Sequence, residues 1–368
     1  MVLKNRSTES LAKKDRVVPT GLTGLLSRSH NSRQDENSLD ATDWRLSMRS
    51  AVRSAKDLRR RLGLPEADPA TQEAENAFPT FVSLEFLSRI EHGNPDDPLL
   101  RQVLAIGAEM VEAAGFADDP VGDEAATVAP GLLQKYAKRA LVVASGICGV
   151  HCRYCFRREF DYSSSQSAAF ALRDAWETAI YELSERNDID EVILSGGDPL
   201  TLSDAKLDRL ISAIESIPHV NRLRIHSRMP IVIPQRITND FVNRIRASRL
   251  ATWMVVHCNH VAEIDAAVEA AFARLVDAGI PILNQAVLLR GVNDSADALE
   301  ALCRRLVDLR VQPYYLHQLD RVRGAAHFEV PMEQGNAIIA QLRERLPGYA
   351  VPRYAVEEAG KKSKTVIA

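Results

Sequence analysis

The segment ALVVASGICGVHCRYCFRR, residues 140–158, joins a short apolar run to a cluster of cysteines. Its first part, residues 140–145, has the length and composition of a buried strand. Three cysteines follow within eight residues, at Cys148, Cys152 and Cys155. In parallel sheets, ligands bind beyond the carboxyl ends of the strands. The segment therefore predicts a parallel α/β fold that carries its chemistry directly after the first strand.

Downstream of this segment, short β-rich runs alternate with amphipathic helical patterns. Strands are expected at 140–145, 191–195, 222–227, 252–257, 280–289 and 311–319. Helices are expected at 167–186, 202–217, 238–248, 261–278, 295–309 and 331–346. Six βα units in succession predict a parallel sheet with right-handed crossovers, either a doubly wound sheet or an incomplete barrel.

Upstream, the sequence divides into two further regions. Residues 1–42 are polar and poor in aromatics, which predicts a disordered extension. Acidic residues such as Glu9 and Asp15 disfavour a mitochondrial transit peptide. Residues 43–62 have the pattern of one basic helix, with arginines every four residues, which is either a solvated face or a docking site for an acidic partner. The expected organisation is a helical region at 43–134, a barrel core at 135–347 and a C-terminal segment at 348–368.

Composition excludes several classes of protein. The chain has 368 residues and a formal net charge of −3, which argues against nucleic-acid binding by bulk electrostatics. No apolar run approaches the roughly 20 residues that span a bilayer, and the N-terminus lacks a signal-peptide core. Five cysteines in this length exclude a disulfide scaffold. We therefore expect a cytoplasmic protein without a membrane or nucleic-acid partner.

The cysteine spacing favours one type of metal site. Thiolates suit zinc or iron–sulfur, and three ligands leave one iron of a [4Fe–4S] cluster without a protein ligand. A zinc site requires a fourth ligand, whereas Cys258 and Cys303 stand alone in the sequence. Redox regulation through these cysteines and a chance clustering of cysteines are the alternative interpretations. With Tyr154 before the third cysteine, the CxxxCx-aromatic-C pattern resembles that of the radical S-adenosylmethionine superfamily, in which the open iron binds S-adenosylmethionine.

A second motif follows the next expected strand. Residues 195–199 read SGGDP, and Gly196 and Gly197 allow close approach of backbone to a ligand. An ordinary βα turn is the alternative. In the superfamily, a Gly-Gly-acid motif at this place meets the amino group of S-adenosylmethionine.

Cations bracket the cysteine loop and also occur near the end of the chain. Lys135 and Arg139 precede the first strand, and Arg157 and Arg158 follow the cysteines, which suggests an anionic substrate or cofactor. The terminal lysines would normally be a solvated surface feature. A lysine that forms a Schiff base needs desolvation, so such a tail has to fold over the site.

From about Asp43 to the end, the sequence resembles the lysine 2,3-aminomutases, most closely the short bacterial form that makes (R)-β-lysine for modification of elongation factor P. The fold implied is a partial (βα)6 TIM-like barrel of the radical S-adenosylmethionine type with an N-terminal helical extension. The resemblance rests on GNPDDPLLRQVL (93–104), PGLLQKY (130–136), CRYCFRR (152–158), LSGGDPL (194–200), RLRIHSRMPIVIPQRIT (222–238), NQAVLLRGVND (284–294), PYYLHQLDRVRGAAHF (313–328), GYAVP (348–352) and SKT (363–365).

The resemblance implies three cofactors and a role for each matching residue. Cys148, Cys152 and Cys155 would bind the [4Fe–4S] cluster, and Gly196, Gly197, His257 and Gln285 would line the S-adenosylmethionine pocket. Lys364 would bind pyridoxal 5′-phosphate as a Schiff base, and Lys135 and Arg139 would bind its phosphate. Arg157 would contact the substrate carboxylate, and Asp320 and Glu357 would bind the distal ammonium of L-lysine.

The implied reaction is a 1,2-amino shift. A 5′-deoxyadenosyl radical removes hydrogen from C3 of lysine, the nitrogen moves from C2 to C3, and hydrogen returns to C2. The product would go to elongation factor P through its lysine ligase. Free β-lysine metabolism, a related aminomutase acting on glutamate or arginine, and a non-catalytic iron–sulfur or zinc protein are the alternatives.

The sequence departs from the long free-lysine enzymes in three places. The chain ends four residues after Lys364, and Ser295 stands where those enzymes have a zinc-ligand cysteine. These differences argue against structural zinc and leave the homo-oligomer open. The glycine run before the lysine is also replaced, so Lys361 and Lys362 compete with Lys364 for the Schiff-base role.

Overall fold

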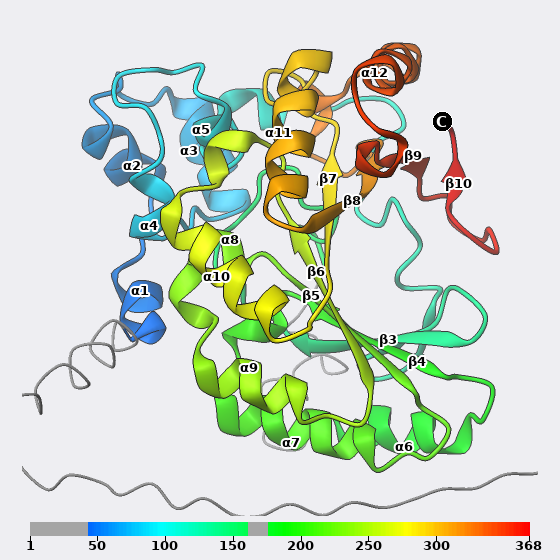
Figure 1. Ribbon diagram of the computed structural model, residues 1–368. Helices are drawn as coiled ribbons and strands as arrows, with labels where there is room; N and C mark the ends of the chain where they lie inside the picture. The colour runs from blue at the N-terminus through cyan, green and yellow to red at the C-terminus, as the bar shows by residue number, and fades with distance from the viewer. Residues whose placement is uncertain (1–42, 161–175) are drawn as a thin grey trace, which may run out of the picture. The chain divides into compact units, whose positions relative to one another are not determined.

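The computed structural model describes residues 43–160 and 176–368, which belong to one compact unit (Figure 1). The expected extension at 1–42 and the first part of the expected helix at 167–186 lie outside the described residues. The proposed boundaries at 134/135 and 347/348 remain predictions within this unit. No helix of the described residues is long and apolar enough to cross a membrane.

One sheet runs through the described residues, with its strands in sequence order. The strands are β1 (Thr127–Ala129), β2 (Leu132–Leu133), β3 (Arg139–Ser145), β4 (Glu191–Gly196), β5 (Arg222–Ser227), β6 (Ala251–His257), β7 (Ile282–Val287), β8 (Val311–His317), β9 (Arg353–Val356) and β10 (Thr365–Val366). Strands β3 to β9 are parallel, and β1, β2 and β10 pair antiparallel. The six expected parallel strands, β3 to β8, are confirmed.

Helices follow the strands as the alternation predicts. The α-helices are α1 (Trp44–Ser50), α2 (Ala55–Arg61), α3 (Pro69–Ala77), α4 (Leu84–Leu87), α5 (Pro98–Arg101), α6 (Glu177–Glu185), α7 (Asp204–Glu215), α8 (Met229–Val232), α9 (Asn239–Arg246), α10 (Ala266–Asp277), α11 (Ala296–Asp308) and α12 (Met332–Arg345). The 3-10 helices are η2 (Gly107–Met110), η4 (Pro199–Thr201), η5 (Pro234–Arg236), η6 (Val261–Glu263), η7 (Ala326–Phe328) and η8 (Gly348–Ala350).

The alternation along strand β5 explains why one face of the sheet packs against helices and the other face is polar. Leu223, Ile225 and Ser227 are buried, whereas Arg222, Arg224 and His226 alternate with them. Helices such as α7 and α9 cover the outer face with apolar side chains at helical spacing (Figure 1). The alternating polar side chains therefore face the inside of the curved sheet, as in a partial barrel.

The expectation of a single basic helix over 43–62 is wrong. The chain is extended between α1 and α2, where Val52 pairs with Val82 as an isolated bridge. Ser54 then caps the second helix by accepting from the backbone N–H of Asp57 at 3.1 Å. Arg53, one of the arginines that recur every four residues, lies outside both helices and stacks on the ring of Phe81 at 4.7 Å. A tertiary strand contact and a local cap thus override the helical periodicity.

The helical region is joined to the cysteine loop by a buried ionic group. Glu109 is fully buried and pairs with Arg153 at 2.6 Å and with Arg158 at 2.9 Å. Arg153 also donates to the Phe78 carbonyl at 2.5 Å. These bonds fix the helical region against the chain segment that contains Cys152 and Cys155.

We expect Glu109→Gln to lower the free energy of unfolding by about 3–5 kcal/mol, because it removes the buried counter-charge that Arg153 and Arg158 share. The measurement is the urea midpoint of the first unfolding transition. Asp277→Asn, which removes the exposed pair with Arg310 at 2.7 Å, is the control and should change stability by less than about 1 kcal/mol. Equal midpoints for Glu109→Gln and the parent protein would contradict this role.

Candidate functional site

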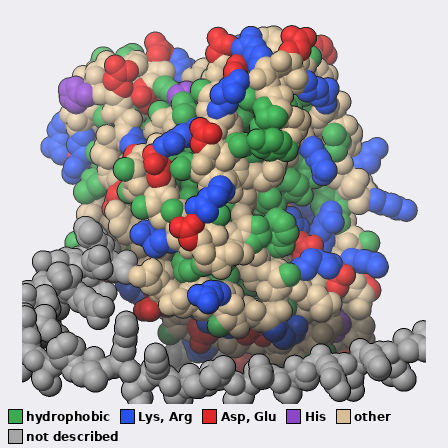
Figure 2. Space-filling model, viewed as in Figure 1, with side chains coloured by type: hydrophobic (Ala, Val, Ile, Leu, Met, Phe, Trp, Pro, Cys, Tyr) green, Lys and Arg blue, Asp and Glu red, His purple; other side chains and the backbone are tan. Residues whose placement is uncertain are grey.

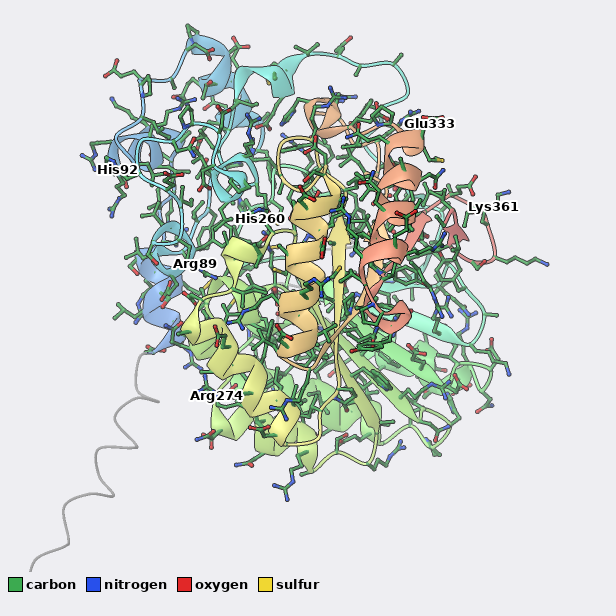
Figure 3. The ribbon with its side chains drawn as sticks, turned by 45° about the horizontal axis from the view of Figure 1, so that its top comes forward. Arg89, His92, His260, Arg274, Glu333 and Lys361 are labelled. Carbon is green, nitrogen blue, oxygen red and sulfur yellow. The ribbon has the colours of Figure 1, made fainter. Side chains whose placement is uncertain are left out.

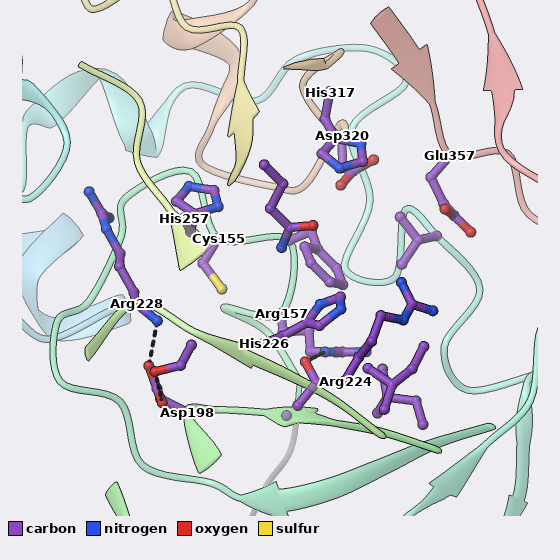
Figure 4. A pocket seen from close by; sticks show the side chains of 18 of the residues that line it. Cys155, Arg157, Asp198, Arg224, His226, Arg228, His257, His317, Asp320 and Glu357 are labelled. Carbon is purple, nitrogen blue, oxygen red and sulfur yellow. Dashed lines mark hydrogen bonds between the residues drawn. The ribbon is translucent and has the colours of Figure 1, made fainter. Parts of the chain in front are cut away.

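A cavity of about 1130 Å³ is lined by the inner face of the sheet and the carboxyl ends of its strands (Figure 4). Every residue to which the family resemblance gives a site role lines it. These residues are Lys135, Arg139, Cys148, Cys152, Cys155, Arg157, Gly196, Gly197, His257, Gln285, Asp320, Glu357 and Lys364. On the outer face in view in Figure 2, acidic, basic and hydrophobic side chains are interspersed.

The cysteine loop leaves β3 and is fixed against β4 by backbone bonds. Asp198 N–H donates to the Ile147 carbonyl, and Gly197 N–H donates to the Ser145 carbonyl, both at 2.7 Å. Burial, reinforced by the neighbouring Cys152, raises the pKa of the Cys155 thiol to about 11. Burial also raises the pKa of Cys148. A bound cation reverses this effect, because coordination deprotonates a thiol outright.

The two glycines of SGGDP are required by the chain's own packing. Gly196 has a φ of +107°, and a Cβ there would lie 2.8 Å from the Ser145 carbonyl oxygen. A Cβ at Gly197 would lie 2.6 Å from the Ile147 carbonyl oxygen. The glycines therefore let the end of β4 pass close to the backbone of the cysteine loop.

Asp198, the acid of the same motif, is turned inward. It is 4% exposed and accepts from the Ser227 hydroxyl and from the backbone N–H of Arg228, each at 2.7 Å. Burial raises its pKa, although these hydrogen bonds act in the opposite direction. The side chain ties the carboxyl end of β4 to that of β5 (Figure 4).

Asp123 is a site residue that sequence reasoning missed. Its two oxygens pair with Lys135 Nζ at 2.7 Å and with Arg157 Nε at 2.6 Å. The guanidinium of Arg157 and the ammonium of Lys135 lower the pKa of Asp123 against the opposing effect of burial. Asp123 therefore joins two of the predicted anion-binding cations, and its loop position gives no periodic signal in the sequence.

Glu357 and Lys364 lie on the C-terminal segment and form an ion pair inside the cavity. Tyr136 donates from its hydroxyl to Glu357 at 2.5 Å, and Lys135 Nζ lies 3.9 Å from the same carboxylate. By contrast, Lys361 is exposed and points away from the fold (Figure 3). Lys362 is also exposed and does not line the cavity.

The remaining polar groups come from β5, β7 and the end of β8. Burial raises the pKa of Asp320 to about 7, with Lys364 opposing and Glu357 adding to the shift. Burial lowers the pKa of His317 to about 3 and that of His226 well below its usual range. Gln285 lines the cavity from the inner face of β7.

Arg139 lines the cavity from the start of β3. Its guanidinium lies 4.5 Å from the centre of the Tyr136 ring. Together with Lys135, which lies 3.9 Å from the Glu357 carboxylate, it gives this part of the cavity two cations. Arg224 and His226 also line the cavity, and sequence reasoning missed both. Their alternation along β5 was the signal that could have found them.

Comparison with known proteins agrees with this geometry. A family model described as "4Fe-4S single cluster domain" matches residues 136–223, which include the three cysteines. L-lysine 2,3-aminomutase from Escherichia coli is 44% identical over 90% of this chain and 96% of its own length. The enzyme of the same name from Haemophilus influenzae is 42% identical over 89% and 96% of the two chains.

A longer relative is also similar along most of this chain. L-lysine 2,3-aminomutase from Clostridium subterminale is 34% identical over 93% of this chain and 82% of its own length. Identity at these levels over nearly the whole length extends well beyond the cysteine motif. The chain therefore belongs to the L-lysine 2,3-aminomutase family, and it is an isomerase.

Proposed function

We propose that this protein moves the α-amino group of L-lysine from C2 to C3 and gives (R)-β-lysine, using a [4Fe–4S] cluster, S-adenosylmethionine and pyridoxal phosphate. The observation that carries the proposal is that side chains of both charges line the cavity. One part offers the Arg157 guanidinium, and another offers the carboxyl groups of Asp320 and Glu357. A substrate with a carboxylate and a distal ammonium complements both.

The chain's own side chains support this assignment. The Asp123 carboxylate pairs with Arg157, as a substrate carboxylate would. The Lys364 ammonium pairs with Glu357, as the distal ammonium of lysine would. The cavity thus already holds a carboxylate against Arg157 and an ammonium against Glu357. These are the two kinds of charged group that bound lysine would present.

The cysteine loop fits a cluster better than a single ion. Among residues 43–160 and 176–368, no three His, Cys, Asp or Glu side chains converge as ligands of one metal ion. In a four-iron cluster each cysteine binds a different iron, so its three thiols need not converge on one point. Cys148, Cys152 and Cys155 would hold the cluster, while the loop's close contact with Gly197 would place S-adenosylmethionine beside it.

The C-terminal segment fits pyridoxal phosphate. Lys364 is the terminal lysine that lines the cavity, and Arg139 and Lys135 are cations suited to a phosphate. When bound, the three cofactors together supply an electron, a hydrogen-abstracting radical and an electron-delocalising partner for the substrate amine.

The protein's part in the reaction is placement and protection. Arg157 would hold the carboxylate, and Asp320 and Glu357 would hold the distal ammonium, so that C3 faces the cluster side of the cavity. Because both ends of lysine would be fixed, the hydrogen transfer would take place between groups that already lie side by side. The largely apolar walls of the cavity would limit the access of water to the reacting carbons.

The pH dependence of lysine binding tests the role of Asp320. Protonated Asp320 cannot pair with an ammonium, and burial raises its pKa to about 7. We therefore expect kcat/KM for lysine to rise with pH, about tenfold per unit below that pKa, and to level off above it. Asp320→Asn should lower kcat/KM and remove this rise. An unchanged pH profile in Asp320→Asn would show that another group controls binding.

A substrate panel tests the proposal as a whole. Anaerobic, reconstituted protein is incubated with L-lysine, L-glutamate or L-arginine, and the products are separated by chiral chromatography. Conversion of lysine to (R)-β-lysine in preference to the others supports the proposal. Preference for glutamate would overturn it, because Asp320 and Glu357 would then face a third carboxylate.

We further propose that the β-lysine is used by a ligase that modifies elongation factor P, as the resemblance to the short bacterial form suggests. The test is the intact mass of elongation factor P after incubation with the ligase and the product of this enzyme. No increase in mass would leave free β-lysine metabolism as the use of the product.

A further inference from the structure

Arg228 places a buried positive charge against the cysteine loop. It follows β5 directly and is 7% exposed. Its guanidinium donates to the Cys152 sulfur at 2.7 Å and to the Tyr154 hydroxyl at 2.9 Å. A charged donor this close stabilises negative charge on the sulfur.

The same guanidinium is held from its other side by two acceptors. It donates to Gln102 Oε1 at 2.7 Å and pairs with Glu263 Oε2 at 3.0 Å. Gln102 in turn donates to the other oxygen of Glu263 at 3.1 Å. Gln102 and Glu263 are both fully buried, so the guanidinium has little freedom to leave the sulfur.

This network also reaches two positions expected to contact S-adenosylmethionine. The Tyr154 hydroxyl lies 2.9 Å from His257 Nε2, and the backbone N–H of Arg228 donates to Asp198 of the SGGDP motif at 2.7 Å. Figure 4 shows Arg228 between Asp198 and His257, on the same side of the cavity as Cys155. One arginine thus joins a cluster ligand to two walls of the neighbouring pocket.

We propose that Arg228 is a positioning residue that raises the reduction potential of the cluster, and that Glu263 limits this effect. The proposal rests on the proposed function, because it requires the cluster on Cys148, Cys152 and Cys155. Reduction adds one negative charge to the cluster, and a guanidinium bonded to a ligand sulfur stabilises that charge. Hydrogen bonds to the sulfurs and nearby charges are among the features that set cluster potentials.

The arrangement has a consequence for the Glu263 carboxylate. The negative charge of Glu263 lies behind the Arg228 guanidinium. It partly cancels the positive potential that this guanidinium produces at the Cys152 sulfur. Removing Arg228 and removing Glu263 should therefore shift the potential in opposite directions. A purely structural role for the network predicts no such opposite signs.

The test is an EPR-monitored redox titration of four reconstituted variants, after iron and sulfide content and circular dichroism have been measured. Arg228→Gln should lower the ratio of reduced to oxidised cluster at a fixed potential by about tenfold or more, which is 59 mV for one electron. Arg228→Lys keeps the charge and should shift the ratio less. Glu263→Gln should shift the ratio the other way.

Arg236→Gln is the matched control. Arg236 is also a fully buried arginine, but it donates to the Leu200 carbonyl at 2.7 Å and pairs with Asp204 at 2.8 Å, and it does not line the cavity. Its removal should leave the potential unchanged. If Arg228→Gln takes up no cluster, Glu263→Gln decides the question by the sign of its shift.

An unchanged potential in a fully loaded Arg228→Gln protein, or in Glu263→Gln, would overturn the inference. So would equal shifts in Arg228→Gln and Arg236→Gln. Failure of the proposed function is distinguishable, because the parent protein would then bind no cluster or would leave lysine unchanged.

Discussion

Cys152→Ala is expected to abolish lysine conversion, with a loss of at least about 10³-fold in kcat, and to lower the iron bound per chain. The three cysteines act as one unit, so the removal of one disables the set rather than a third of it. The thiol of Cys152 also accepts from Arg228, so its loss leaves a buried guanidinium short of one acceptor. Iron and sulfide content, the visible absorbance and the rate of β-lysine formation measure the effect.

Cys303→Ala is the matched control for this change. Cys303 is a buried cysteine of α11 that packs in the hydrophobic core and does not line the cavity. Its removal should cost some stability but keep the iron content and activity. Continued conversion of lysine by Cys152→Ala would contradict the assignment of a cysteine-bound cluster.

Lys364→Ala is expected to cause the second large loss, again at least about 10³-fold in kcat, together with loss of the visible absorbance of bound pyridoxal phosphate. Only an amine can form the Schiff base, so Lys364→Arg should fail as well although it keeps the charge. The measurements are the absorbance spectrum after gel filtration and the rate of lysine conversion.

Lys361→Ala and Lys362→Ala are the controls. Both side chains are exposed, and neither lines the cavity. Both variants should keep the absorbance and the activity. Loss of absorbance in one of them, with Lys364→Ala unaffected, would move the Schiff base to that lysine.

Much of the fold could be predicted from the sequence because its strands are long enough to show a pattern. Strands such as Arg222–Ser227 are apolar or alternating runs between clear helices. Strands β1, β2 and β10 at the two ends of the sheet were missed because they contain only three, two and two residues, which is too short for any periodicity. The basic helix over 43–62 failed because the Val52–Val82 bridge is a tertiary contact.

The candidate site could be predicted where a motif marks it. The cysteines and SGGDP have fixed spacing, and family resemblance located Arg157, Asp320 and Lys364. Asp123 has no such mark, since it reaches Lys135 and Arg157 only through the path of its loop.

The Arg228 network could not be read from the chain either. Its members, Gln102, Tyr154 and Glu263, are far apart in sequence and meet only when the helical region packs on the barrel. Gln102 follows the short helix α5, Tyr154 lies in the cysteine loop and Glu263 ends the 3-10 helix η6, and none of these segments has a period that predicts contact.

The most direct test of the central claim is the fate of deuterium from L-[3,3-²H₂]lysine. Anaerobic protein with reductant, S-adenosylmethionine and pyridoxal phosphate should give β-lysine that carries deuterium at C2, and recovered S-adenosylmethionine should carry deuterium at C5′. Both positions are read by NMR and mass spectrometry. Absence of β-lysine, or β-lysine whose new C2 hydrogen comes from solvent with unlabelled S-adenosylmethionine, would contradict the account.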